Sequence, residues 1–227
     1  MTTSGTAAFT LDLAEIVEEA FERCGSELRS GYDLRTARRS LNIMLSEWAN
    51  RGVNLWTLEQ GAIPLVAGTA TYDLPADTVD LLEHVTRTGT GQSQQDINLT
   101  RISVSTYATI PNKNDTGRPL QIWVERLNTP RVKLWPVPDN STPYTMVYWR
   151  LRRIQDAGTG GAATQDVPFR FLPALIAGLA YHLSVKLPGA MDRIQMLKAQ
   201  YDEAFTLAAE EDRDRAAVRF VPRSFTV

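Results

Sequence analysis

The sequence predicts an α+β protein: a helical bundle, built from helices near both ends of the chain, with an inserted antiparallel β-rich domain and an extended C-terminal tail. Apolar residues recur with helical spacing near both ends, whereas the middle of the chain alternates apolar and polar residues between turn formers. We expect an N-terminal helix pair over residues 1–56, a β-rich insertion over 57–160, C-terminal long helices over 161–215 and an extended tail over 216–227.

The bulk composition is that of an ordinary globular protein. The 227 residues suffice for one large domain or two small ones, with 43% hydrophobic and 22% charged residues. A net charge of −2 does not favour wrapping around nucleic acid. The one cysteine, Cys24, excludes an internal disulfide framework. The first residues lack the pattern of a secretion signal, so we expect synthesis in a cytoplasm and no membrane anchor.

Two amphipathic helices are predicted near the N-terminus. Thr10 or Asp12 is expected to cap the first helix, whose apolar stripe ends at Cys24, and Cys24 is interpreted as a small core residue. Asp33 is expected to cap the second helix, and Gly52 follows its last turn. The short link between them predicts an antiparallel pair.

The middle of the chain predicts strands. Residues Ala62–Val66 and Ala70–Pro75 are interpreted as a β-hairpin. A short helix is predicted after Ser103. Further strands are expected over Val79–Thr88, Leu120–Arg126, Arg131–Trp135 and Tyr144–Ile154. We expect three tryptophans to build the core of the sheet, with an exposed aromatic platform for a ligand as the alternative: Trp123, Trp135 and Trp149.

The C-terminal part predicts two helices. Asp156–Ala163 is expected to be a flexible link, followed by a helix over Phe171–Leu187 that is apolar on nearly all sides and therefore buried. After a break at Pro188–Gly189, apolar residues at helical spacing predict one buried face of a long second helix: Met191, Ile194, Leu197, Tyr201, Ala204, Phe205 and Ala208.

Two basic clusters each allow two readings. Arg35, Arg38 and Arg39 form either a solvated helix face or a binding patch. Arg150, Arg152 and Arg153 are paired with Asp156 and neighbouring carboxylates, or they contact another subunit or a nucleic acid in a channel.

No signature of catalysis stands out. His84 and His182 belong to no metal-ligand cluster, and no common nucleophile motif is present. A pair of catalytic carboxylates is not excluded. We therefore expect no enzyme, and no catalytic, cofactor or metal site.

Several passages together resemble a known family. They include Ala37–Leu45 running into Glu47–Trp56, Pro64–Tyr72 followed by Leu74–Asp77, and a set of shorter passages. The shorter passages are Ile110–Lys113, Gly117–Pro119, Leu134–Pro136 and Leu151–Ile154. Each is weak alone, but their order and spacing over residues 10–222 resemble the head-to-tail adaptor, or connector, proteins of tailed bacteriophages.

The resemblance implies a structural virion protein in the neck. Copies would form a homo-oligomeric ring below the portal, commonly a dodecamer, around a channel for double-stranded DNA. The ring would bind the portal protein above and a tail or nozzle protein below, and it would seal the neck between genome packaging and DNA ejection.

The C-terminal tail is the candidate docking segment. It alternates apolar and polar residues without helical period, so it can add to a partner's sheet edge or fill its groove; a frayed terminus is the simpler alternative. The resemblance implies docking to the portal through Phe220, Val221, Pro222, Arg223 and Phe225. Two other functions stay open: a virion-associated cell-wall hydrolase, and a DNA-binding module that uses the arginines at 150, 152 and 153.

Overall fold

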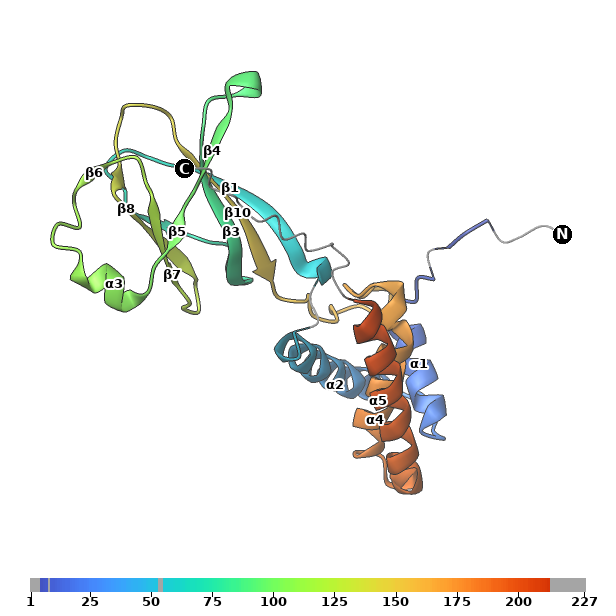
Figure 1. The fold of residues 1–227 in the computed structure, drawn as a ribbon. Coiled ribbons are helices and arrows are strands. Elements are labelled where there is room, and N and C mark those ends of the chain that lie inside the picture. The colour runs from blue at the N-terminus through green and yellow to red at the C-terminus, as the bar shows by residue number, and fades with distance from the viewer. Residues whose placement is uncertain (1–4, 8, 53–54, 213–227) are drawn as a thin grey trace, which may run out of the picture. The chain divides into compact units, whose positions relative to one another are not determined.

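In a computed structural model, the described residues are 5–7, 9–52 and 55–212. They divide into two compact units. The helical unit combines the part of the chain up to Trp56 with the part from Ile154 onward, and the β unit spans Thr57–Arg153. Over these residues the fold is α+β, with five α-helices and several mainly antiparallel sheets, and the predicted fold class is confirmed at this level (Figure 1).

Within the described residues, four α-helices build the helical unit. These are α1 (Leu13–Arg23), α2 (Gly31–Asn50), α4 (Leu172–Ser184) and α5 (Ile194–Glu211). Three 3₁₀ segments accompany the helices: η1 (Leu55–Thr57) before the first strand, η3 (Phe169–Phe171) before α4, and η4 (Pro188–Arg193) between α4 and α5.

Capping boxes begin the two N-terminal helices. Asp12 accepts from the Glu15 backbone N–H at 2.9 Å and Glu15 returns the bond, as predicted. The predicted cap of α2 was wrong: Ser30 is the N-cap, and Asp33 is the third helical residue, whose carboxylate accepts from the Ser30 backbone N–H at 3.1 Å. The side chains of Ser30 and Asp33 each accept a hydrogen bond from the other residue's backbone N–H. The helix therefore begins at Gly31, before Asp33, which the sequence analysis had taken as the cap.

The core of the helical unit surrounds α4. Nine residues of α4 are buried, and α1, α2 and α5 all pack against it. At its amino end the Trp48 ring lies 5.5 Å from Phe171 and 5.4 Å from Phe205, and its Nε1 donates to the Tyr201 hydroxyl at 2.8 Å. Met191 was expected in the buried face but is 65% exposed, because it belongs to η4 and not to the period of α5.

The segment Asp156–Ala163 is held in place and does not form the expected flexible link. The Ala157 N–H donates to Asn42 Oδ1 at 2.8 Å, and the Leu13 N–H donates to the Ala163 carbonyl at 2.9 Å. Ala157 is fully buried. The glycine content suggested flexibility, but hydrogen bonds to α1 and α2, which are distant in sequence, fix the position of this segment.

The β unit consists of two four-stranded sheets and a small two-stranded one. The first has the order β1 (Leu58–Pro64), β10 (Thr145–Arg152), β3 (Thr78–Thr88) and β4 (Gln95–Asn98). The second has the order β2 (Thr71–Asp73), β8 (Arg131–Trp135), β7 (Gln121–Glu125) and β5 (Thr100–Arg101). β6 (Thr116–Gly117) pairs with β9 (Val137–Pro138), and α3 (Val104–Thr109) begins after Ser103 as predicted.

The predicted hairpin over Ala62–Pro75 was wrong. β1 pairs with β10 and β2 pairs with β8, so the two strands join different sheets. The turn between them passes the chain from one sheet to the other, because both strands contribute apolar side chains to one shared core. That core combines residues from both sheets, among them Leu81, Ile122, Val132, Leu134, Met146 and Tyr148.

The three tryptophans do not form this core. Trp123 and Trp135 lie on the face of β7 and β8 that points away from it, and Trp149 is 36% exposed. The Trp123 ring packs 4.9 Å from Tyr107 of α3, and Lys133 Nζ lies 4.7 Å from the centre of the Trp123 ring. The buried positions of β7 and β8, which alternate with the tryptophans, hold aliphatic residues.

Gly178 provides a test of how closely α4 packs. A Cβ at this position would contact Met44 Sδ and lie 2.7 Å from the Tyr201 ring. We expect Gly178→Ala to lower the free energy of unfolding by about 1–3 kcal/mol, because the buried side chains of Met44 and Tyr201 would have to shift to admit the methyl group. Urea denaturation followed by circular dichroism measures this change.

Gly189→Ala is the matched control, since nothing lies within 4 Å of a Cβ there. Its effect should stay within about 0.5 kcal/mol. Equal effects of the two substitutions would contradict the close packing.

Candidate functional site

The described residues contain few groups suited to chemistry. Among them, no three or more His, Cys, Asp or Glu side chains come together as a metal site, and no described helix is long and apolar enough to cross a membrane. Cys24 is buried as predicted, and its Sγ donates to the Ala180 carbonyl at 3.2 Å. Burial raises the pKa of the Cys24 thiol to about 11, so the reactive thiolate is scarce near neutral pH.

The two histidines are isolated in separate units. His84 of β3 is 5% exposed, and neither ring nitrogen has a hydrogen-bond partner among the described residues. Burial, followed by the charge of Arg101, lowers the pKa of His84. In α4, His182 Nε2 lies 3.9 Å from Glu47, and burial again lowers its pKa. Both rings are therefore held neutral, an arrangement that favours a structural role.

Arg150 and Arg152 belong to a charged network inside the β unit. Arg150 Nη2 lies 2.8 Å from Glu59 Oε2, its Nη1 donates to Asp77, and Arg152 Nε lies 2.6 Å from Glu59 Oε1. The two arginine side chains are only 12% and 10% exposed. The hydrogen bond from Arg150 lowers the pKa of Asp77. The network joins the first and last strands, β1 and β10, to the start of β3.

Their partners differ in part from the expected ones. The prediction that these arginines pair with carboxylates is confirmed for Arg150 and Arg152, but their partners Glu59 and Asp77 are distant along the chain. Asp156 instead accepts from the Gly158 backbone N–H. Arg153 is exposed, and its Nη2 donates to the Ala76 carbonyl at 3.0 Å. Contacts of these three arginines with another subunit or with DNA stay predictions.

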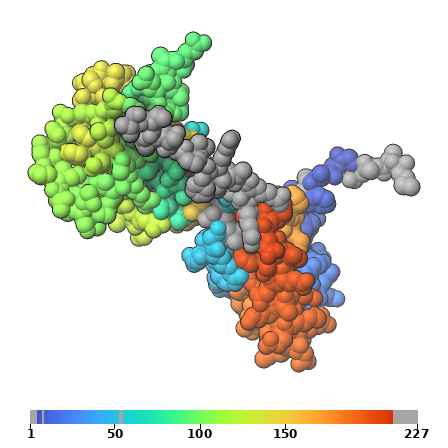
Figure 2. Space-filling model, in the orientation of Figure 1, coloured from blue at the N-terminus to red at the C-terminus, as the bar shows by residue number. Residues whose placement is uncertain are grey.

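The loop over Thr88–Gln95 is exposed, as predicted from its polar composition. It contains the 3₁₀ segment η2 (Gly91–Ser93) and projects from the rest of the β unit (Figure 2). In the described residues no α-helix follows Gly89 and Gly91 directly, so the loop lacks the architecture of a phosphate cradle.

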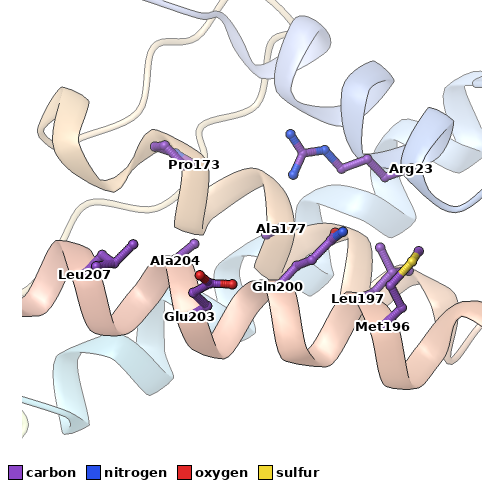
Figure 3. A pocket seen from close by; sticks show the side chains of 9 residues that line it. All are labelled: Arg23, Pro173, Ala177, Met196, Leu197, Gln200, Glu203, Ala204 and Leu207. Atoms are coloured by element: carbon purple, nitrogen blue, oxygen red, sulfur yellow. The ribbon is translucent and has the colours of Figure 1, made fainter.

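The more informative features are two grooves on the helical unit. The first, called the α5 groove, runs along α5 beside α4 and the end of α1, and encloses about 500 Å³ (Figure 3). Figure 3 shows the α5 side chains rising from one side of the helix while Arg23 reaches in from α1. It is lined by Arg23, Pro173, Ala177, Met196, Leu197, Gln200, Glu203, Ala204 and Leu207.

The second groove, called the α2 groove, runs along α2 beside α1 and the end of α4, and encloses about 430 Å³. It shares no lining residue with the α5 groove. It is lined by Phe21, Tyr32, Asp33, Thr36, Arg39, Ile43, Leu183, Lys186 and Leu187.

Both grooves expose large apolar side chains to solvent. Met196 and Leu207 are 50% and 63% exposed, and Tyr32 and Ile43 are 63% and 61% exposed. The sequence analysis did not identify these residues, because it considered only the face of each helix that was expected to be buried. The sequence feature that could have revealed these surfaces is the recurrence of apolar residues on the otherwise polar face of each helix. Exposed apolar residues gathered in a groove are typical of a surface that contacts protein.

The end of α5 is fixed just before the tail. The buried carboxylate of Asp212 pairs with Arg170 and accepts from the Leu55 backbone N–H at 3.5 Å. The predicted docking residues Phe220, Val221, Pro222, Arg223 and Phe225 lie outside the described residues.

The two grooves expose apolar side chains, as surfaces that contact other proteins commonly do. The profile of the SU10 adaptor protein family matches residues 11–223, and the chain belongs to this family. The family indicates a phage adaptor protein, a structural component of the virion that interacts with other virion proteins. Among proteins with curated descriptions, none matches the chain.

Acid should destabilise the β unit through His84. Because the folded pKa lies below the ordinary value of 6.5, the unfolded chain binds more protons as the pH falls through 6.5 towards the lowered pKa. Stability is therefore fully present above pH 6.5 and is lost progressively below it. Hydrogen exchange of β3 and β10 amides at pH 7 and pH 5 measures this loss.

His84→Leu should flatten the pH dependence in the β unit, because the group that titrates is gone. His182→Leu is the control, since it removes a histidine with the same direction of shift from the helical unit. An unchanged pH dependence of β-unit exchange in His84→Leu would show that another group is responsible.

The network around Arg150 should stabilise the β unit. We expect Arg150→Met to lower the free energy of unfolding of the β unit by about 1–3 kcal/mol, because Glu59 and Asp77 lose a largely desolvated partner. Both carboxylates are partly exposed to solvent, so the loss should be smaller than for a fully buried ion pair. Arg118→Met is the matched control, because Arg118 is exposed. Thermal unfolding compares the two variants, and an equally stable Arg150→Met would refute the role of the network.

Proposed function

We propose that this protein joins the portal vertex to the tail, with copies forming a ring around the DNA channel and sealing the neck after packaging. The observation that carries the proposal is the match of the adaptor family over residues 11–223. A ring requires each copy to contact two neighbours through two different surfaces. The two grooves of the helical unit, which share no lining residue, meet that requirement.

The charge of the chain is compatible with a channel for DNA. A net charge of −2 gives no strong attraction to phosphate, so DNA can pass without being retained. Arg150 and Arg152 already pair with Glu59 and Asp77, which disfavours the alternative of a DNA-binding module built on them. The exposed Arg153 is the one we propose as a subunit or channel contact.

The tail is proposed to bind the portal protein above the ring. Its apolar residues, among them Phe220, Val221 and Phe225, are interspersed with polar ones without a helical period, as expected of a segment that adds to a sheet edge or fills a groove. The tail or nozzle protein would bind below, and the ring would commonly hold twelve copies, as the resemblance implies. The family match does not support the alternative hypothesis of a cell-wall hydrolase, since the adaptor family indicates a structural protein.

Removing the tail tests this function. A chain that ends after Ala217 should keep its fold, because the contacts that fix the end of α5 involve Asp212, and it should lose binding to the portal protein. Mixing with purified portal protein, followed by light scattering and electron microscopy, measures binding; circular dichroism checks the fold.

Point variants refine the same test. Phe220→Ala with Phe225→Ala should weaken portal binding at least about tenfold, since buried aromatic anchors dominate such contacts. Ser224→Ala with Thr226→Ala is the matched control and should bind normally. Particles that keep genome and tail with the shortened chain would overturn the proposal.

A further inference from the structure

Two exposed stripes on the helical unit have the same spacing. Along α5 the stripe consists of Met196, Gln200, Glu203 and Leu207, and along α2 it consists of Tyr32, Thr36, Arg39 and Ile43. Each stripe reads apolar, polar, charged, apolar, with steps of four, three and four residues. Each therefore covers three turns of helix, about 16 Å, and lines one groove.

The unpaired charges of the two grooves are opposite. In the α5 groove Arg23 pairs with Glu19 at 2.9 Å, which leaves Glu203 as the uncompensated charge. In the α2 groove the carboxylate of Asp33 is used by the capping box of α2. Among the residues that the structure describes, Arg39 Nη2 and Lys186 Nζ there donate to the hydroxyls of Thr36 and Ser40, at 3.3 and 2.6 Å. Within the described residues, the α5 groove thus offers a carboxylate without an ion pair, and the α2 groove offers two cations without one, beside exposed apolar side chains.

The two helices run in the same general direction in one copy. The end of α2 lies at the start of α4, where Trp48 packs on Phe171, while its middle lies at the end of α4, where Lys186 reaches Ser40. The end of α5 also lies at the start of α4, where Phe205 packs 6.4 Å from Phe171. A rotation between neighbouring copies can therefore place α5 of one copy parallel to α2 of the next.

We propose that the α5 stripe of one copy packs in parallel on the α2 stripe of the next copy, so that copies associate head to tail. In this register Met196 meets Tyr32, Gln200 meets Thr36, Glu203 pairs with Arg39 and Leu207 meets Ile43. An antiparallel register would place Glu203 opposite Thr36 and leave Arg39 without its carboxylate. This contact assigns the surfaces of the ring and in that respect rests on the proposed function.

Cysteine cross-linking tests the contact and its register. Full-length Met196→Cys copies are mixed with Tyr32→Cys copies on purified portal protein, and disulfide formation is followed by non-reducing electrophoresis. Cys24 stays silent because it is buried. We expect dimers from the mixture and none from either variant alone, since each copy presents a different surface to its neighbour. Met196→Cys with Ile43→Cys is the matched control for register and should give none.

Charge reversal gives a second readout. Glu203→Lys and Arg39→Glu should each weaken association of copies about tenfold or more, and a chain carrying both should recover it. Asp202→Lys reverses an exposed acidic residue on another face of α5 and should have little effect. Circular dichroism confirms the fold of each variant, and failure of the double variant to recover would overturn the pairing.

The outcomes separate this inference from the proposed function. Rings on the portal without the Met196–Tyr32 cross-link overturn the inference and leave the function standing. A cross-link from Met196→Cys to the portal, or to Ser224→Cys in a neighbouring tail, shows another occupant and also overturns it. If no complex with the portal forms, the proposed function fails, and the same cross-linking with concentrated protein alone then supports or overturns the contact.

Discussion

The helical unit depends on the burial of α4. This helix is apolar on nearly all sides, and exposing it would cost roughly 25 cal/mol for each Å² of apolar surface, so the other helices must cover it. Gly178 allows Met44 and Tyr201 to approach the backbone of α4 closely. Because α4 occupies the centre, α2 and α5 each turn one face inward and leave the opposite face to solvent.

In the β unit, the pairing of the first and last strands has a comparable role. β1 and β10 are antiparallel neighbours, with Leu58 opposite Leu151, so the chain begins and ends the unit at adjacent positions. Arg150 connects both strands to the start of β3 through Glu59 and Asp77. A cluster that looked like a basic patch in the sequence therefore closes the unit, because its carboxylate partners are distant along the chain.

The sequence predicted most features that depend on neighbouring residues, although the N-cap of α2 is Ser30 and not Asp33. Helix periods, the capping box at Asp12 and the cap of α3 at Ser103 follow from local chemistry, and all three were correct. Features that depend on distant partners were missed. Nothing local shows that β1 pairs with β10, or that the Asn42 side chain holds the link at Ala157. The prediction that the three tryptophans form the sheet core was wrong for a related reason. A large aromatic residue suggests a core position, but its identity does not show which face of the strand it occupies.

The candidate site escaped prediction because each helix carries two patterns at once. The inward pattern of α5, with Leu197, Tyr201 and Phe205, dominates the period and hides the apolar residues on the outer face. The outer stripe becomes visible only when burial separates the two faces. Since the inward residues stabilise the unit and the outward ones do not, surface charges such as Glu203 can be exchanged at little cost in stability. Helical geometry alone separates the two faces of α2 and α5, because their buried residues recur at spacings of three and four.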